Sequence, residues 1–127
     1  MGSNADIIKS AYDAFAQQDI PAVLAAFDPD IAWYTPDTVR FGGTFKGHDE
    51  VVGFFSKLPE SYTELRVEPD EFIESGDRVV VLGHLRGKAA GGDFDERFAH
   101  VWSFTDGKAT SFEEFFDTVR IGKAIGD

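Results

Sequence analysis

Two residues near the C-terminal end of the chain could do acid/base chemistry. They are His100 and Asp117, within the segment FAHVWSFTDGKATSFEEFFDT. An imidazole titrates close to neutral pH, and a carboxyl group buried among apolar side chains can keep its proton there too. Either group can therefore give or take a proton in a reaction. We expect Asp117 to act as the acid or base, with His100 or His84 assisting it.

The turn between the two strands of this segment decides whether His100 and Asp117 can meet. A two-residue turn at Asp106-Gly107 places His100 opposite Glu113. His100 and Trp102 then share a face of the sheet with Asp117. A three-residue turn with a glycine bulge shifts the register by one residue, so that His100 and Trp102 point away from that face. The sequence permits both arrangements.

Each of these residues also has a purely structural explanation. Asp117 could be a strand-end residue that is bonded to a backbone amide or simply solvated. His100 could be a hydrogen-bonded histidine of the core or of an interface. His84 follows Val80 and Leu82 on the same strand face, which favours a position in a cavity over one in solvent.

Aromatic residues are abundant enough to line a pocket as well as fill a core. The chain has 127 residues, of which 13 are Phe, 3 Tyr and 2 Trp. Large rings leave shaped gaps between them, and such gaps favour binding of apolar ligands. The residues expected to line a substrate pocket are Tyr12, Phe15, Trp33, Thr35, Phe55, Trp102 and Phe115.

Helices are expected first along the chain and strands second. Apolar spacing predicts helices over 3–19, over a short stretch that Asp19 caps, and over 48–58. It predicts strands over 28–36, 64–74, 77–87, 93–104 and 108–119, the last four joined by hairpin signals. This order is typical of the α+β class. We expect a curved, mostly antiparallel sheet wrapped around the N-terminal helices, forming a cone-shaped α+β barrel with one open end.

Composition and motifs exclude several classes of function. The net charge of −11 disfavours nucleic acid and anionic membranes as partners, and the chain has no cysteine. It has no apolar run of transmembrane length, so a soluble, cytoplasmic protein is expected. No phosphate-binding or nucleophile motif occurs. Neither a metal nor an organic cofactor is expected, although His84, His100 and Asp117 could in principle converge on a metal.

Four segments together resemble SnoaL-like proteins of the nuclear-transport-factor-2-like superfamily. They are YDAFAQQDIPAVLAAFDPDIAWYTP, GGTFKGHDEVVGFF, GDRVVVLGHLRG and FAHVWSFTDGKATSFEEFFDT. The resemblance covers nearly the whole chain, so residues 1–127 are expected to form one SnoaL-like domain. It implies a curved sheet over three helices, an apolar cavity at the open end, and commonly a homodimer through the outer sheet face. In the polyketide cyclases of this superfamily an aspartate near the end of the last strand is the acid/base, and Asp117 in FFDT matches it.

The chain departs from two other enzyme types of the superfamily. Ketosteroid isomerases have a base carboxylate at the end of the first strand, where this chain has Thr35. Their oxyanion-hole aspartate and tyrosine would fall near Ala99 and Ala11. Epoxide hydrolases need an Asp-Arg-Asp set, and the middle strand here offers His84 and Arg86 without a matching aspartate.

Two kinds of function remain open. The first is a cofactor-independent isomerase, cyclase or hydrolase that acts on a small, mostly apolar carbonyl or polycyclic compound through Asp117. The alternative is a non-catalytic ligand-binding or dimeric interaction domain.

Overall fold

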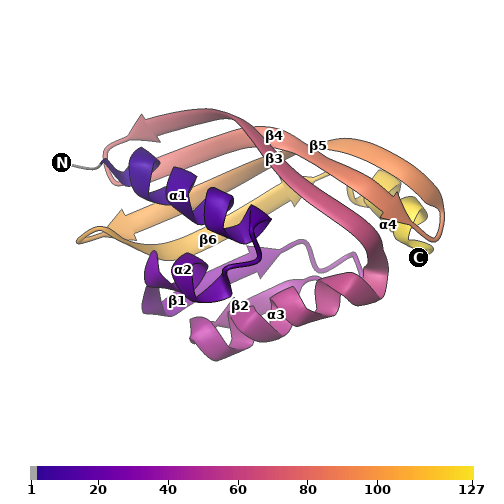
Figure 1. The fold of residues 1–127 in the computed structure, drawn as a ribbon, viewed down its shortest axis with the longest axis horizontal. Coiled ribbons are helices and arrows are strands. Elements are labelled where there is room, and N and C mark those ends of the chain that lie inside the picture. Colours follow the sequence, from indigo (N-terminus) through magenta and orange to yellow (C-terminus); the bar gives the residue numbers. More distant parts are fainter. Residues whose placement is uncertain (1–2) are drawn as a thin grey trace.

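The computed structural model describes residues 3–127 and shows a curved sheet with three helices on its concave side (Figure 1). In chain order the elements are α1 (Asn4–Ala16), α2 (Ile20–Ala25), β1 (Phe27–Thr35), β2 (Gly43–Lys46), α3 (Gly47–Ser61), β3 (Tyr62–Ser75), β4 (Arg78–Ala89), β5 (Gly92–Thr105), β6 (Lys108–Phe116) and α4 (Thr118–Ile125). Among residues 3–127, no helix is both long enough and apolar enough to cross a membrane.

The six strands form one sheet in the order β2-β1-β6-β5-β4-β3. Only β1 and β6 run parallel, and the other neighbouring pairs are antiparallel. The predicted α+β class and the curved, mostly antiparallel sheet are therefore confirmed. The sheet is not closed, because β2 and β3 remain as free edges. It is an open cone and not a barrel.

The helix starts follow the capping signals in the sequence. Ser3 and Asp6 form a reciprocal capping box at the start of α1. Asp19 accepts a hydrogen bond from the backbone of α2, and Pro21 stands in the first turn of that helix. Two elements were not predicted: the short strand β2, and α4, whose first residues were assigned to the last strand.

The hairpin between β5 and β6 contains both a two-residue turn and a bulge. Thr105 pairs with Lys108, and Asp106 and Gly107 have φ angles of 51° and 75°. This is the two-residue turn. Thr110 is then inserted between paired residues of β6, which shifts the register by one. Beyond the bulge, His100 lies opposite Glu114. Neither sequence-based alternative had this combination.

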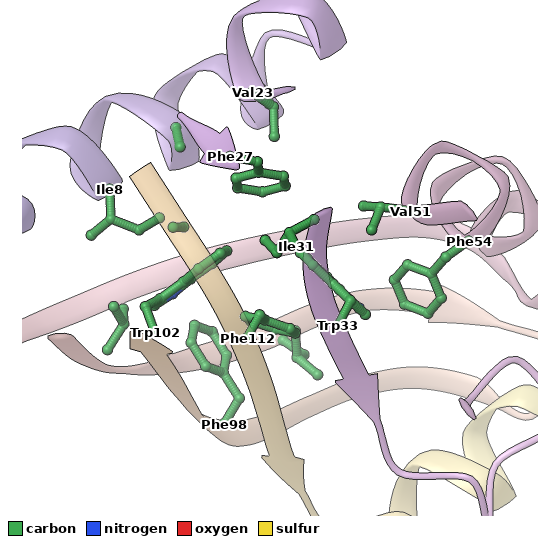
Figure 2. Packing of buried hydrophobic residues seen from close by; sticks show 14 of the residues in the cluster. Ile8, Val23, Phe27, Ile31, Trp33, Val51, Phe54, Phe98, Trp102 and Phe112 are labelled. Carbon is green, nitrogen blue, oxygen red and sulfur yellow. The ribbon is translucent and has the colours of Figure 1, made fainter. Parts of the chain in front are cut away.

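The core lies between the concave face of the sheet and the helices, and aromatic rings dominate it. Trp33 of β1 stacks on Phe112 of β6, with ring centroids 3.8 Å apart. Figure 2 shows Trp33 between Phe112 and Phe54, with Phe27 toward the helices. An apolar cavity remains between the rings of the sheet and those of the helices.

Candidate active site

Two polar side chains occupy the inner face of the sheet among the aromatic rings. His100 on β5 and Glu114 on β6 are 4% and 8% exposed. Their side chains point to the same face because strand residues alternate and the two residues lie opposite each other. The imidazole of His100 also stacks on Phe98, with ring centroids 3.9 Å apart. A buried carboxyl group and a buried imidazole are costly unless they are hydrogen-bonded.

A chain of hydrogen bonds satisfies both groups. His100 Nε2 lies 2.9 Å from Glu114 Oε2, and His100 Nδ1 lies 2.6 Å from the hydroxyl oxygen of Tyr12 on α1. Trp102 Nε1 donates to the same hydroxyl oxygen over 3.0 Å. The helix therefore completes a polar chain that begins on the sheet.

A second series of hydrogen bonds reaches Glu114 from β1. Thr35 Oγ1 donates to Glu114 Oε1 over 2.9 Å, and Trp33 Nε1 donates to Thr35 Oγ1 over 3.2 Å. Thr35 has no exposed surface at all. Within residues 3–127, every buried polar side-chain atom has a hydrogen-bond partner. The carboxyl group of Glu114 is thus held from both sides, in a fixed orientation.

An apolar cavity opens in front of this chain. Its walls include Phe15 of α1, Phe55 of α3 and the two tryptophans, Trp33 and Trp102. The cavity volume is about 80 Å³, and beyond it the space continues into open solvent. The hydrogen-bonded chain reaches the cavity wall at Tyr12, His100 and Glu114. A ligand there would meet aromatic rings on most sides. It would meet polar groups only at Tyr12, His100 and Glu114, which we call the polar strip.

The electrostatics of the cavity keep its tyrosines protonated. Burial raises the pKa of the Tyr12 hydroxyl well above its usual value; the Trp102 hydrogen bond lowers it, and the charge of Glu114 raises it. Burial and, secondarily, Glu114 also raise the pKa of Tyr62. Among the described residues that line the cavity there is no lysine or arginine. Glu114 is the one carboxyl group among these lining residues.

Asp117 lies outside the cavity, so its expected position there is wrong. Its side chain is about half exposed, and its Oδ1 accepts from the backbone amides of Val119 and Arg120 at 3.1 and 3.0 Å. It is the N-cap of α4. The geometry therefore supports the structural explanation of Asp117, which is bonding to backbone amides.

His84 is also placed away from the cavity. It stands on the outer face of β4, where its Nδ1 lies 2.7 Å from Asp95 Oδ1, and Arg86 binds the same carboxylate. Val81 and Leu85, on the opposite parity, point inward and are buried. The expectation that His84 faces the cavity is wrong, because the inward positions on β4 are odd-numbered.

The structure divides the remaining expected pocket residues. Phe115 is 48% exposed on the outer face, so it does not line the cavity. Thr35 is buried and does not line the cavity. It donates a hydrogen bond to Glu114, which does. The others contribute to the cavity wall: Tyr12, Phe15, Trp33, Phe55 and Trp102. Their role toward a substrate stays a prediction.

Glu114 is the polar residue of the site that the sequence-based assignment missed. Glu113 and Glu114 differ in parity, so one of them had to face inward. The signal that decides between them is the bulge at Thr110, which no residue pattern in KATSFEEFF marks. For residues 3–127 no cluster of three potential ligands that could hold a metal ion is present. His84 and His100 lie on opposite faces of the sheet.

Comparisons with known proteins agree on one family. The model of the SnoaL-like domain family matches residues 8–112. A nuclear-transport-factor-2-like protein of unknown function from Burkholderia pseudomallei is 44% identical, covers 100% of both chains and superposes with a TM-score of 0.94. TerC, crystallised with polyporic acid, is 36% identical over 98% of both chains, with a TM-score of 0.91. An uncharacterised protein of Mycobacterium tuberculosis is 26% identical over 87% of this chain and 86% of its own length.

Proposed function

Because the chain belongs to the SnoaL-like domain family, we propose that it binds a small, mostly apolar molecule in the cavity and moves a proton on a carbonyl or hydroxyl group of that molecule. The observation that carries this proposal is the buried chain from Glu114 through His100 to Tyr12, which ends at the cavity. A core that only needed to pack would not bury a carboxyl group and an imidazole side by side.

The hydrogen-bonded side chains of Glu114, His100 and Tyr12 stand in the order that proton transfer needs. A carboxylate orients an imidazole through one ring nitrogen, and the other nitrogen faces a hydroxyl group. This order resembles that of catalytic triads, in which the carboxylate fixes the tautomer and stabilises the charged imidazole. Tyr12 would contact the ligand, His100 would exchange the proton, and Glu114 would position His100.

The shape of the cavity and one relative suggest the first ligand to test. The walls are aromatic, so they favour a ligand that presents flat apolar surface. TerC, which is 36% identical and covers 98% of this chain, was crystallised with polyporic acid. We therefore take polyporic acid as the first probe of the cavity.

Binding of polyporic acid is expected to quench the tryptophan fluorescence of the protein. Both tryptophans of the chain line the cavity, so their emission reports its occupancy. The same ligand should stabilise the fold by about 2.7 kcal/mol at a hundredfold excess over its Kd. Fluorescence titration and thermal unfolding measure the two effects.

Conversion of the bound compound then tests catalysis. Loss of a general acid or base costs roughly 10² to 10⁴-fold in rate. Tyr12→Phe should therefore slow any turnover by that factor, whereas Tyr34→Phe, on the other face of β1, should not. Asp117→Asn should also leave turnover unchanged, because Asp117 caps α4. Equal rates in wild type and Tyr12→Phe would contradict the proposed mechanism.

A non-catalytic binding or interaction domain is the second candidate. It is favoured by the complete internal pairing of the polar chain, which leaves no described buried polar side-chain atom unpaired. The outer sheet face also exposes Ile73 and Phe115, at 45% and 48%. We propose that this face forms a homodimer. Polyporic acid that binds without change would favour the binding domain, and a monomer in sedimentation at micromolar concentration would exclude the dimer.

A further inference from the structure

The hydrogen bonds of the buried chain determine where its protons lie. The indoles of Trp33 and Trp102 can only donate. Trp33 donates to Thr35, whose own hydroxyl donates to Glu114 Oε1. Trp102 donates to the oxygen of Tyr12, so the hydroxyl proton of Tyr12 is available for His100 Nδ1.

Counting protons gives one assignment in which every donor of the hydrogen-bonded chain is paired within it. The chain contains five hydrogen bonds. They need five protons, and a neutral His100 with an ionised Glu114 supplies that number, one for each bond. His100 then carries its proton on Nε2 and donates it to Glu114 Oε2. One more proton, on His100 Nδ1, would turn the hydroxyl hydrogen of Tyr12 out of the chain and toward the cavity.

This assignment makes the polar strip of the empty cavity a base. All five donors point along the chain, so none is free for a ligand carbonyl. What remains available is acceptor capacity, on the oxygen of Tyr12 and on the carboxylate of Glu114, and it can take a hydrogen bond from a ligand hydroxyl. A ligand with an acidic hydroxyl group therefore fits the strip better than one that can only accept.

We propose that the cavity takes compounds with an acidic hydroxyl group, phenols or enols, and binds them as anions while His100 takes the proton through Tyr12. This inference rests on the proposed function and names its ligand class. The ligand O–H bond breaks and its proton moves to the Tyr12 oxygen. The former Tyr12 proton moves to His100 Nδ1, and the Nε2 proton stays toward Glu114.

The surroundings support this transfer. The resulting imidazolium lies between Glu114, 2.9 Å from its Nε2, and the Tyr12 oxygen, 2.6 Å from its Nδ1. The Tyr12 hydroxyl would donate to the ligand anion. Burial holds the pKa of Tyr12 well above its usual value, so Tyr12 passes a proton on without remaining ionised. Of the described titratable groups that line the cavity, the only other one is Tyr62, whose pKa burial also raises.

The test is the ionisation of a bound coloured phenol. 4-Nitrophenol is colourless when neutral and yellow as its anion. It is added to the protein at a pH where the free probe is about one tenth ionised, one unit below its own pKa. Binding to wild type should raise the ratio of anion to neutral probe by about tenfold or more, which visible absorbance measures.

Two variants and one control locate the effect. Glu114→Gln keeps the shape of the side chain and removes its charge, and Tyr12→Phe removes the link between ligand and His100. Either change should return the bound probe to its neutral form. Glu113→Gln removes an exposed carboxylate from the neighbouring position on the outer face, and should leave the tenfold rise unchanged.

The outcomes separate this inference from the proposed function. A probe that quenches the tryptophans but stays colourless overturns the inference and leaves the binding function intact. An anionic bound probe that persists in Glu114→Gln and Tyr12→Phe also overturns it, because other groups would then hold the anion. Absence of binding to wild type for both 4-nitrophenol and polyporic acid would overturn the inference and the proposed function together.

Discussion

Replacing His100 with alanine is expected to lower the free energy of unfolding by about 3 to 5 kcal/mol. The change removes the donor that faces Glu114 Oε2 and leaves a buried carboxylate without its main partner. It also removes the acceptor of the Tyr12 hydroxyl. Losing a partner inside the protein costs more than the net value of the hydrogen bond, because the remaining group has no water to bind. Chemical denaturation followed by circular dichroism measures the loss.

The double variant His100→Ala, Glu114→Gln separates this cause from simple loss of packing. If the unpaired charge dominates, adding Glu114→Gln should restore part of the lost stability, and the two changes will not be additive. His84→Ala is the matched control, because His84 faces Asp95 on the outer face, where ion pairs contribute about 0 to 1 kcal/mol. Equal losses for His84→Ala and His100→Ala would contradict the role assigned to the buried chain.

Trp33→Ala is expected to cost about 3 to 5 kcal/mol, the usual range for removing a large buried ring. Trp33 contacts the rings of Phe112, Phe54 and Phe55, and is 6% exposed. Its removal also leaves Thr35 without the donor at Nε1. The midpoint of thermal unfolding should fall by roughly 10 to 20 °C in a domain of this size. Scanning calorimetry measures that shift.

Two further substitutions divide the effect of Trp33 into its parts. Trp33→Phe keeps an aromatic ring and removes the indole donor, so it should cost less than Trp33→Ala. Tyr34→Ala removes a half-buried ring from the other side of the same strand and should cost less still. A loss for Tyr34→Ala as large as that for Trp33→Ala would show that the inner ring cluster is not the main source of stability.

The helices and the long strands could be predicted because their signals are local. Ser3 and Asp19 mark helix starts, and alternation over 77–87 and 93–104 indicates strands with one buried face. The strand β2 escaped prediction because it has only four residues and begins within a glycine pair. Helix α4 escaped prediction because Phe115 and Phe116 extend the strand pattern as far as its N-cap, Asp117. That pattern led us to assign Asp117 to the strand.

The candidate site was harder to predict because it depends on register. The sequence identified His100, Tyr12, Trp33 and Trp102 as residues of interest. It could not place Glu114 inward, since a single inserted residue at Thr110 reverses the faces of β6 relative to β5. No local pattern marks that insertion, because Thr and Ser are acceptable both in a regular strand and in a bulge.

The resemblance to SnoaL-like proteins correctly indicated the fold, but the residue that it matched for acid/base chemistry does not line the cavity. Analogy with the cyclases selected Asp117, which caps a helix here. Analogy with ketosteroid isomerases pointed to Ala11 and Ala99, each one residue before the pair that the structure brings together, Tyr12 and His100. Thr35, at the position of the isomerase base, instead holds Glu114. The family therefore indicates the fold, and the chain's own register determines which residues face the cavity.

The most direct test of the central claim is the protonation of the His100 ring, measured by ¹⁵N NMR of the ring nitrogens at neutral pH. We expect a neutral ring with the proton on Nε2 and none on Nδ1, because Nε2 donates to Glu114 and Nδ1 accepts from Tyr12. Saturation with 4-nitrophenol should then add a proton at Nδ1. A proton on Nδ1 in the free protein, or a ring that the ligand leaves unchanged, would contradict the proton chain from Tyr12 to Glu114.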